Sequence, residues 1–110
     1  MTYKFYYTDY STDKHIRSDE AVSESLDSII GHMNSLLQEP DNFIGIIDEN
    51  NVMLQFMVED DGSICVDIPM HDQKGSLTKN ANLNECISLV DSLQENILIE
   101  QIEGLEFKSW

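Results

Sequence analysis

The chain has 110 residues with 21 Asp or Glu against 6 Lys or Arg, a formal net charge of −15 at pH 7, and 41% hydrophobic residues. This length and composition predict one folded domain covering residues 1–110, and the charge disfavours direct binding to nucleic acid or to an anionic membrane surface. No apolar run approaches the roughly 20 residues that span a bilayer, and the first residues lack the pattern of a secretory signal, so the sequence predicts a cytoplasmic protein.

A strand and then a helix are predicted in the first 40 residues. Aromatic and polar residues alternate over residues 3–9, which is typical of a half-buried strand, and residues 9–17 have the composition of a loop. From Ser18 the apolar residues recur at helical spacing, and Pro40 marks the end of that helix. The apolar stripe of the predicted helix is formed by Val22, Leu26, Ile29, Met33 and Leu36.

Residues 43–70 predict a meander of three strands joined by two tight turns. An apolar run begins at Phe43, and the residues from Asp48 to Asn51 have the composition of a turn. A strictly alternating strand follows, and Asp-Gly at Asp61–Gly62 supplies the positive φ of a second hairpin. A third alternating strand ends at Pro69. These two hairpins indicate an antiparallel sheet.

The last 40 residues predict a loop, a helix and a tail. Residues 70–81 are polar and read as a loop, and Asn82 followed by Glu85 has the pattern of a capping box that begins a helix. The apolar face of this helix fades near Asn96. The tail to Trp110 mixes apolar and acidic residues, so a short helix followed by an extended segment is expected there.

The predicted fold class is therefore α+β, an antiparallel sheet of about four strands with two main helices, in the order β-α-β-β-β-α plus a C-terminal tail. One sheet face would be buried by Val52, Leu54, Phe56 and Val58. The opposite face would carry Met53, Gln55, Met57, Cys65 and Asp67. Methionines adapt to irregular partners, so this second face either binds a partner or is covered by the tail or the first loop.

Reaction chemistry has no signature in this sequence. His15, His32 and His71 are scattered and fit no common zinc motif. Cys65 and Cys86 predict two reduced, packed thiols, because one falls in a strand and the other on the apolar side of a helix. The acidic turn at residues 59–62 departs from the calcium-loop pattern, and no glycine-rich phosphate loop or nucleophile elbow is present. No catalytic residue, metal site or cofactor is predicted, and the chain is expected not to be an enzyme.

The distribution of acidic residues is the strongest feature of the sequence. Carboxylates occur in the first predicted helix, in both hairpin turns, in the third strand and in the tail, and only Lys74 and Lys79 interrupt them over residues 18–107. One interpretation is a solvated acidic surface that keeps the protein soluble. The other is a surface that meets a basic cleft, since such fields can raise association rates by about 10–10³-fold.

Three stretches carry a family resemblance: FIGIIDENNVMLQFMVEDDGSICVDIP (residues 43–69), KGSLTKNANLNECISLVDSL (residues 74–93) and the ending GLEFKSW. Together they resemble small acidic immunity proteins of bacterial polymorphic-toxin and contact-dependent inhibition systems. The resemblance covers residues 43–110 and implies a single-domain α+β protein that binds the toxin domain, often a nuclease or deaminase, and blocks it without catalysis. No contact residue follows from the resemblance itself.

The leading hypothesis is therefore a non-catalytic immunity-type inhibitor, with a basic toxin domain as its partner and an acidic hairpin side as its contact surface. Its alternatives are a nucleic-acid mimic and a small adaptor subunit, and a ligand-binding domain or small enzyme would need a deep pocket with convergent polar groups. The oligomeric state is left open. The candidate partner-binding residues are Asp48, Glu49, Met53, Met57, Glu59, Asp60, Asp61, Asp67 and Asp72.

Overall fold

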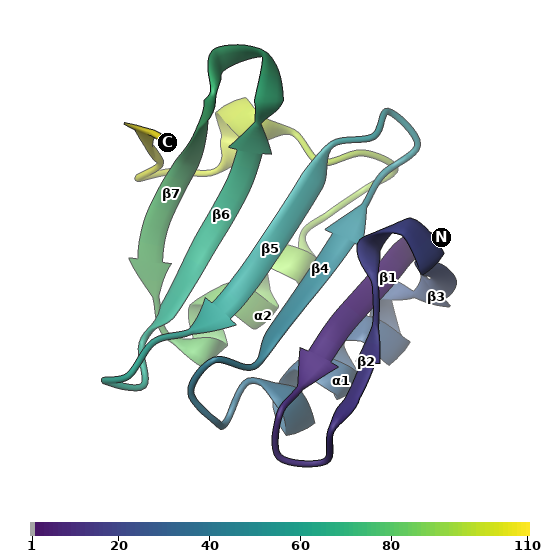
Figure 1. The fold of residues 1–110 in the computed structure, drawn as a ribbon. Helices are drawn as coiled ribbons and strands as arrows, with labels where there is room; N and C mark the ends of the chain where they lie inside the picture. Colours follow the sequence, from purple (N-terminus) through teal and green to yellow (C-terminus); the bar gives the residue numbers. More distant parts are fainter. Residues whose placement is uncertain (1) are drawn as a thin grey trace.

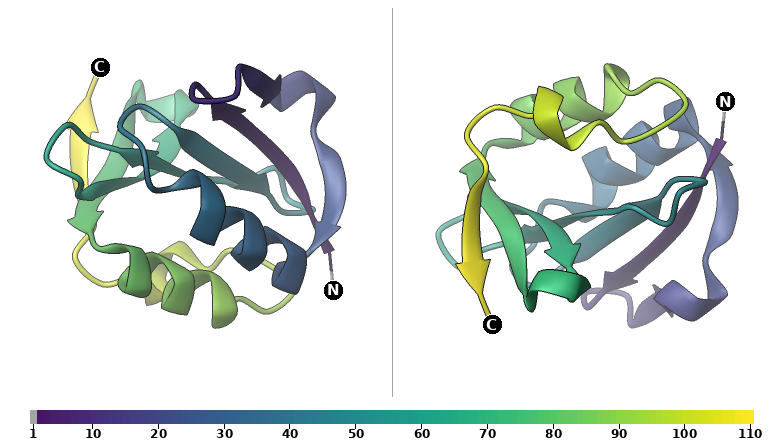
Figure 2. Two further views of the ribbon diagram at one scale, coloured as in Figure 1. Left: turned by 90° about the horizontal axis from the view of Figure 1, so that it is seen from below. Right: turned by 90° about the horizontal axis from the view of Figure 1, so that it is seen from above.

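A computed structural model describes residues 2–110 as one antiparallel sheet of eight strands with both α-helices on the same face (Figures 1 and 2). The strand order is β2-β1-β4-β5-β6-β7-β8, and β3 pairs with β1 beside β2. The elements are β1 (Thr2–Asp9), β2 (Lys14–Ile16), η1 (Ser18–Glu20), β3 (Val22–Ser25), α1 (Leu26–Leu36), β4 (Phe43–Ile47), β5 (Met53–Val58), β6 (Ile64–Met70), η2 (His71–Gln73), β7 (Gly75–Ala81), α2 (Leu83–Asp91), η3 (Ile99–Gln101) and β8 (Glu106–Ser109), where η denotes a single 3₁₀ turn.

The expectation of about four strands is wrong, because four short or polar strands lie outside the central meander. β2 and β8 fall in segments that read as a loop and a tail, and β7 forms within the predicted polar loop. The alternation of apolar and polar residues is not visible in the sequence of β7, because the charged Lys79 occupies a position on the helix-covered side of the sheet. Its partner in β6 there is Val66. β6 also extends past Pro69, where the sequence predicted its end, to Met70. Proline is tolerated at this position because the last residue pair between β5 and β6 is Gln55–Asp67, so the missing N–H of Pro69 removes no hydrogen bond to β5.

Helix α1 begins at Leu26 and not at Ser18. Ser25 caps the helix, because its side chain accepts a hydrogen bond from the backbone N–H of Ser28 at 3.1 Å. Val22 matches the helical spacing by coincidence, since it lies in β3 opposite Phe5 of β1. The predicted capping box of α2 is confirmed: the Asn82 and Glu85 side chains each accept from the other's backbone N–H.

The core lies between the sheet and the two helices. The predicted buried face is confirmed for Leu54, Phe56 and Val58, whereas Val52 precedes β5 and is only partly buried. Residues from β1, β4 and β6 extend this layer, and α1 and α2 close it from the other side (Figure 2). The apolar side chains with no more than 1% exposure are Phe5, Ile29, Met33, Ile44, Ile46, Leu54, Phe56, Ile64, Val66, Ile68, Cys86 and Val90.

Because the thiol of Cys86 is buried, we expect the fold to lose stability at alkaline pH. Burial in the core raises the pKa of Cys86 to about 11, and the neighbouring Glu85 carboxylate adds to the effect. In the unfolded chain the thiol ionises near pH 9, so its contribution to stability is complete below that pH and is lost as the pH rises from 9 to 11.

We therefore expect the free energy of unfolding to fall by up to about 2 kcal/mol from this group over that pH window. Urea denaturation at a series of pH values measures it, with Cys86→Ala as the comparison because its cavity cost does not depend on pH. Two parallel pH profiles for the wild type and the variant would contradict the assignment.

Candidate functional site

The face of the sheet that carries no helix is the candidate site. Because side chains alternate along each strand, the residues that do not enter the core form a second surface. One row of neighbouring residues crosses it from β1 to β7, through the pairs Tyr6–Gly45, Gly45–Gln55, Gln55–Asp67 and Asp67–Thr78. Figure 1 views this surface directly, with both helices behind the sheet. We call it the open face and define it by Tyr6, Phe43, Gly45, Gln55, Met57, Cys65, Asp67, Ser76 and Trp110.

A chain of hydrogen bonds runs through the centre of the open face. The Tyr6 hydroxyl donates to Gln55 Oε1 at 2.6 Å, and Gln55 Nε2 donates to Asp67 Oδ2 at 2.9 Å. Burial, followed by the nearby Asp67 carboxylate, raises the pKa of Tyr6 far above its usual range, so its hydroxyl stays a donor. Gly45 makes room for this arrangement, because a side chain at that position would collide with the Tyr6 ring.

Two neighbouring depressions on the open face share two lining residues, and we refer to the two together as the groove. The first has a volume of about 420 Å³ and is lined by Phe43, Gln55, Met57, Cys65, Asp67, Ser76 and Trp110. The second has a volume of about 520 Å³ and is lined by Tyr6, Thr8, Ile16, Arg17, Ser18, Asp19, Phe43 and Gln55. Phe43 and Gln55 belong to both linings, so the groove extends from the β2–η1 segment to Trp110.

Trp110 forms one wall of the groove and is held from three directions. Its indole Nε1–H donates to Ser76 Oγ at 3.0 Å, and its backbone N–H donates to the Lys74 carbonyl at 2.9 Å. The His71 ring meets the indole edge-on, with 5.4 Å between centroids. Trp110 is nevertheless 67% exposed, and Met57 on the groove floor is 41% exposed. Both side chains therefore present apolar surface to solvent, and the indole does so in a fixed position.

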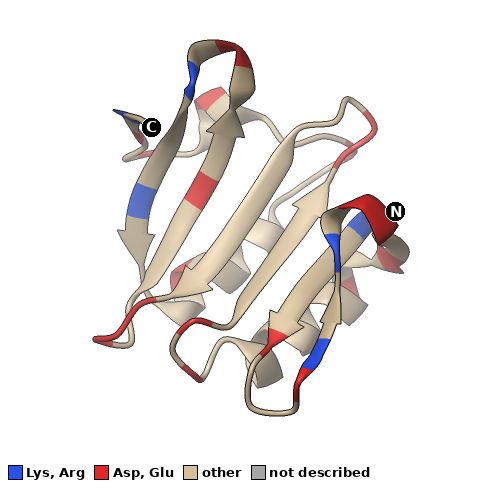
Figure 3. Cartoon of the chain, viewed as in Figure 1, with Lys and Arg blue, Asp and Glu red and all other residues tan. Residues whose placement is uncertain are grey.

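The acidic residues of the predicted contact surface do not form one surface. Glu49 lies in the β4–β5 turn, and Asp72 lies in the β6–β7 connection at the same end of the strands (Figure 1). Glu59, Asp60 and Asp61 lie in the β5–β6 turn, at the opposite end of the strands (Figure 3). The acidic hairpin side expected from the sequence is therefore wrong. Of the predicted partner-binding residues, only Met53, Met57 and Asp67 lie on the strands that form the open face.

Asp48 has a structural position inside the molecule. It is 5% exposed, and its Oδ1 accepts from the backbone N–H groups of Asn50 and Val52, both at 2.9 Å. Its Oδ2 accepts from the backbone N–H of Ile97, also at 2.9 Å. The carboxylate thus closes its own turn and fastens the C-terminal tail to it. Three of its roughly four acceptor sites are used within the chain, and the side chain is buried, which makes it unsuited to the predicted partner contact.

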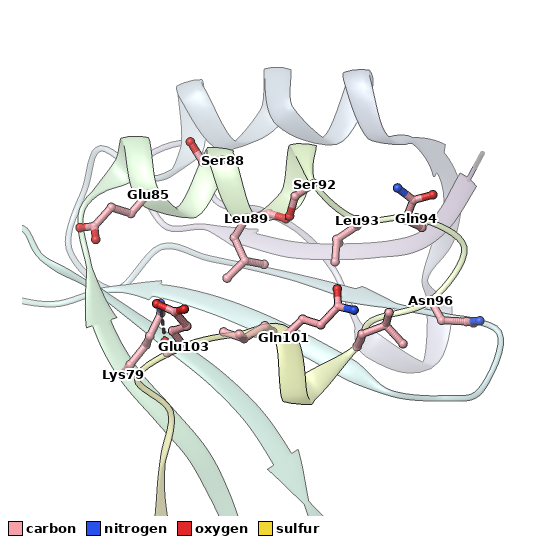
Figure 4. A pocket seen from close by; sticks show the side chains of 12 residues that line it. Lys79, Glu85, Ser88, Leu89, Ser92, Leu93, Gln94, Asn96, Gln101 and Glu103 are labelled. Carbon is pink, nitrogen blue, oxygen red and sulfur yellow. Dashed lines mark hydrogen bonds between the residues drawn. The ribbon is translucent and has the colours of Figure 1, made fainter.

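A second hollow lies between α2 and the tail, and Figure 4 shows it from close by. Its volume is about 370 Å³, and Leu89 of α2 and Leu93, which follows the helix, project towards Gln101 of η3. Lys79 closes one end, because its Nζ donates to the Glu103 carbonyl at 2.9 Å. Glu85 is already engaged in the helix cap. The hollow therefore offers a mixed apolar and amide lining without a group poised for reaction.

Metal-ligating side chains do not cluster in the part of the chain that the structure describes, and the Cys65 thiol is not activated. Residues 2–110 contain no group of three His, Cys, Asp or Glu side chains placed to hold a metal ion. Burial and the carboxylates of Glu59 and Asp67 raise the pKa of Cys65, which keeps this thiol a poor nucleophile. The partly exposed His32 stacks on the buried Phe5, with 4.8 Å between ring centroids.

Most groove-lining residues are not predicted by the sequence, and Tyr6, Phe43 and Trp110 show why. Tyr6 was assigned to a strand, but its place beside Gln55 depends on how β1 pairs with β4 and β4 with β5. Phe43 carries a usable signal, since it alternates with the buried Ile44 and therefore faces the other side. Trp110 carries none, because β8 was expected to be only an extended segment of undefined position.

Comparison with known proteins gives one partial similarity among curated proteins. The chain is 42% identical over 66 residues to a protein named Syd from Shewanella halifaxensis (strain HAW-EB4). The aligned part is 57% of this chain but only 30% of that protein. No family model matches the chain, and no solved structure matches it. No helix among residues 2–110 is long and apolar enough to cross a membrane.

This similarity overturns the expected family. The partially matching protein is Syd, which is not an immunity protein, so the predicted immunity function, toxin-inhibitor role and basic toxin partner are wrong. The resemblance rested on alternating strands, an acidic hairpin and a capped helix, which any acidic protein with an antiparallel meander can share. The separation of the acidic turns to opposite ends of the sheet also removes the surface that this hypothesis required.

Proposed function

We propose that this chain is a non-catalytic interaction protein, an adaptor that binds a partner protein through its open face. The observation that carries the proposal is the groove itself, in which exposed apolar side chains surround a satisfied polar centre. Protein interfaces commonly have this anatomy, with aromatic and methionine side chains at the centre and charges at the rim. The partial similarity to Syd adds no catalytic chemistry to this picture.

The charges of the sheet support a contact at its centre. β4 and β5 contain no charged residue, and the acidic side chains gather at the turns around them (Figure 3). A surface that mimics nucleic acid would instead carry its carboxylates in a row along one face. The distribution therefore favours the adaptor over the nucleic-acid mimic.

The groove defines the chemistry of the segment that it would bind. Phe43, Met57 and Trp110 provide apolar contacts, and the Asp67 carboxylate uses Oδ2 for Gln55 while retaining further acceptor capacity. The partner segment would insert an apolar side chain between Met57 and Trp110 and place a hydrogen-bond donor on Asp67. We place this interaction in the cytoplasm, where the free thiols Cys65 and Cys86 would stay reduced.

Photo-crosslinking in cells tests the proposed surface. A photoreactive residue at position 57 of the open face is expected to give one discrete protein adduct, whereas the same group at Asn34, exposed on α1, is expected to give none. Equal adducts at both positions would contradict a partner that uses the open face. The adduct also identifies the partner for measurements in solution.

Binding measurements with the purified partner give the expected magnitude. Met57→Ala and Trp110→Ala should each weaken the affinity by about 30-fold, because central apolar anchors carry most of the energy of an interface. Leu98→Ala is the matched control, since Leu98 is also a large exposed apolar residue but lines the hollow beside α2. A loss for Leu98→Ala with none for the open-face variants would place the partner in that hollow and refute the proposal.

A further inference from the structure

Strand β8 has an unused edge. It runs antiparallel to β7 at the end of the sheet, and no other described strand pairs with its outer side (Figure 2). All four of its residues are exposed, and Phe107 is 46% exposed. An edge of this kind offers free backbone donors and acceptors to another strand.

The direction of these free backbone groups follows from the β7–β8 ladder. The Trp110 N–H donates to the Lys74 carbonyl, so this pair is hydrogen-bonded. Hydrogen-bonded pairs alternate along an antiparallel ladder, which assigns the backbone groups of Glu106 and Lys108 to β7 as well. The N–H and C=O groups of Phe107 and Ser109 therefore point outward, away from the sheet.

We propose that this edge binds the β8 strand of a second copy of the chain, related by a two-fold axis that passes beside Phe107. In this register the two Phe107 residues exchange backbone hydrogen bonds. Glu106 of each copy then faces Lys108 of the other, on the open-face side of the joined sheet. Such self-complementary contacts are the mark of a two-fold interface between identical chains.

The side-chain charges select this register over its neighbours. An axis beside Lys108 would place the two Lys108 side chains opposite each other, and an axis beside Glu106 would oppose the two Glu106 side chains. Like charges directly across a strand pair are destabilising, whereas opposite charges attract. The axis beside Phe107 creates two Glu106–Lys108 pairs and also brings the exposed Phe107 rings together. The pairing uses the free β8 edge of each copy, so no β8 edge remains to bind a third copy.

The net charge of −15 sets the conditions of the test. Two such chains repel each other at long range, and about 0.15 M salt limits this repulsion to roughly 8 Å. At that ionic strength, sedimentation equilibrium up to millimolar protein should show a monomer–dimer equilibrium. A monomer at every concentration would overturn the proposal.

A charge swap tests the register itself. Glu106→Lys and Lys108→Glu should each weaken dimerisation about tenfold or more, because each turns two attractive pairs into repulsive ones. The double variant Glu106→Lys/Lys108→Glu keeps the net charge of the wild type and restores both pairs, so its dimerisation should return. Glu100→Lys, exposed and outside β8, is the control for the altered net charge. The two-fold β8 interface would be refuted if the double variant dimerised as weakly as the single variants. It would also be refuted if none of these substitutions changed the dimerisation affinity.

Discussion

Replacing Asp48 with alanine will lower the free energy of unfolding by about 4 kcal/mol. The substitution leaves the backbone N–H groups of Asn50, Val52 and Ile97 without their acceptor. A buried unsatisfied donor such as the Ile97 N–H costs about 1–3 kcal/mol, and the partly buried donors of Asn50 and Val52 add smaller losses. The tail also loses its attachment to the β4–β5 turn. Urea denaturation monitored by circular dichroism measures the change.

Two further variants separate this structural role from an effect of charge. Asp48→Asn keeps one acceptor oxygen but presents an amide to the remaining donors, so an intermediate loss is expected. Asp61→Ala removes a carboxylate that also closes a hairpin turn, accepting from the Ser63 N–H at 2.9 Å, but that turn is exposed and water can replace the bond. A loss for Asp48→Ala no larger than for Asp61→Ala would contradict the anchoring role.

Gly45→Ala is expected to cost about 3 kcal/mol of stability and to disrupt the groove. A methyl group at this position collides with the Tyr6 ring, which must move and give up its hydrogen bond to Gln55. Overpacking contributes about 1–3 kcal/mol and the unsatisfied hydroxyl a similar amount. Thermal unfolding measures the loss of stability, and tyrosine fluorescence reports the displaced ring.

A double-mutant cycle assigns this effect to the Tyr6–Gly45 contact. In a Tyr6→Leu background the collision is absent, so the added cost of Gly45→Ala should shrink to less than half. Gly31→Ala is the control for the glycine substitution alone, because Gly31 lies exposed in α1 with no neighbour near a new methyl group. That variant should gain roughly 0.5–1 kcal/mol through helix propensity. Additive losses in the cycle would reject steric conflict as the cause.

Local signals predict the central part of this fold and fail at its edges. Strict alternation and the Asp-Gly turn define β5, β6 and their hairpin, and Asn82 with Glu85 defines the start of α2. These features depend only on residues a few positions apart. β3 and β8 are stabilised by pairing with strands from which other elements separate them in the chain, and the short β2 forms a hairpin with β1. The sequences of these three strands carry no marked periodicity of their own. Helix α1 was predicted too long because Val22 of β3 happens to continue its apolar spacing.

The residues of the candidate site also differ in whether local sequence predicts their position. Met57 and Asp67 were predicted on one face because parity along a strand fixes the face without knowledge of the neighbours. Tyr6 and Trp110 reach the groove only through the pairing of β1 with β4 and of β7 with β8. The role of Asp48 was mistaken for a similar reason, since its third hydrogen bond comes from Ile97, far along the chain. An acidic turn has the same appearance in sequence whether its carboxylate faces water or the backbone.

The order of the strands also has a consequence for the kinetics of folding. From β4 to β7 each strand pairs with its successor in the chain, so this meander forms through short hairpin closures. The β1–β4 pairing must instead wait until the intervening segment with β2, β3 and α1 has been looped out, which carries a larger entropic cost. Such topologies favour a nucleus of local contacts. The meander from β4 to β7 is then the part that orders early, and β1 docks on it later and brings Tyr6 to Gln55 in one of the last steps.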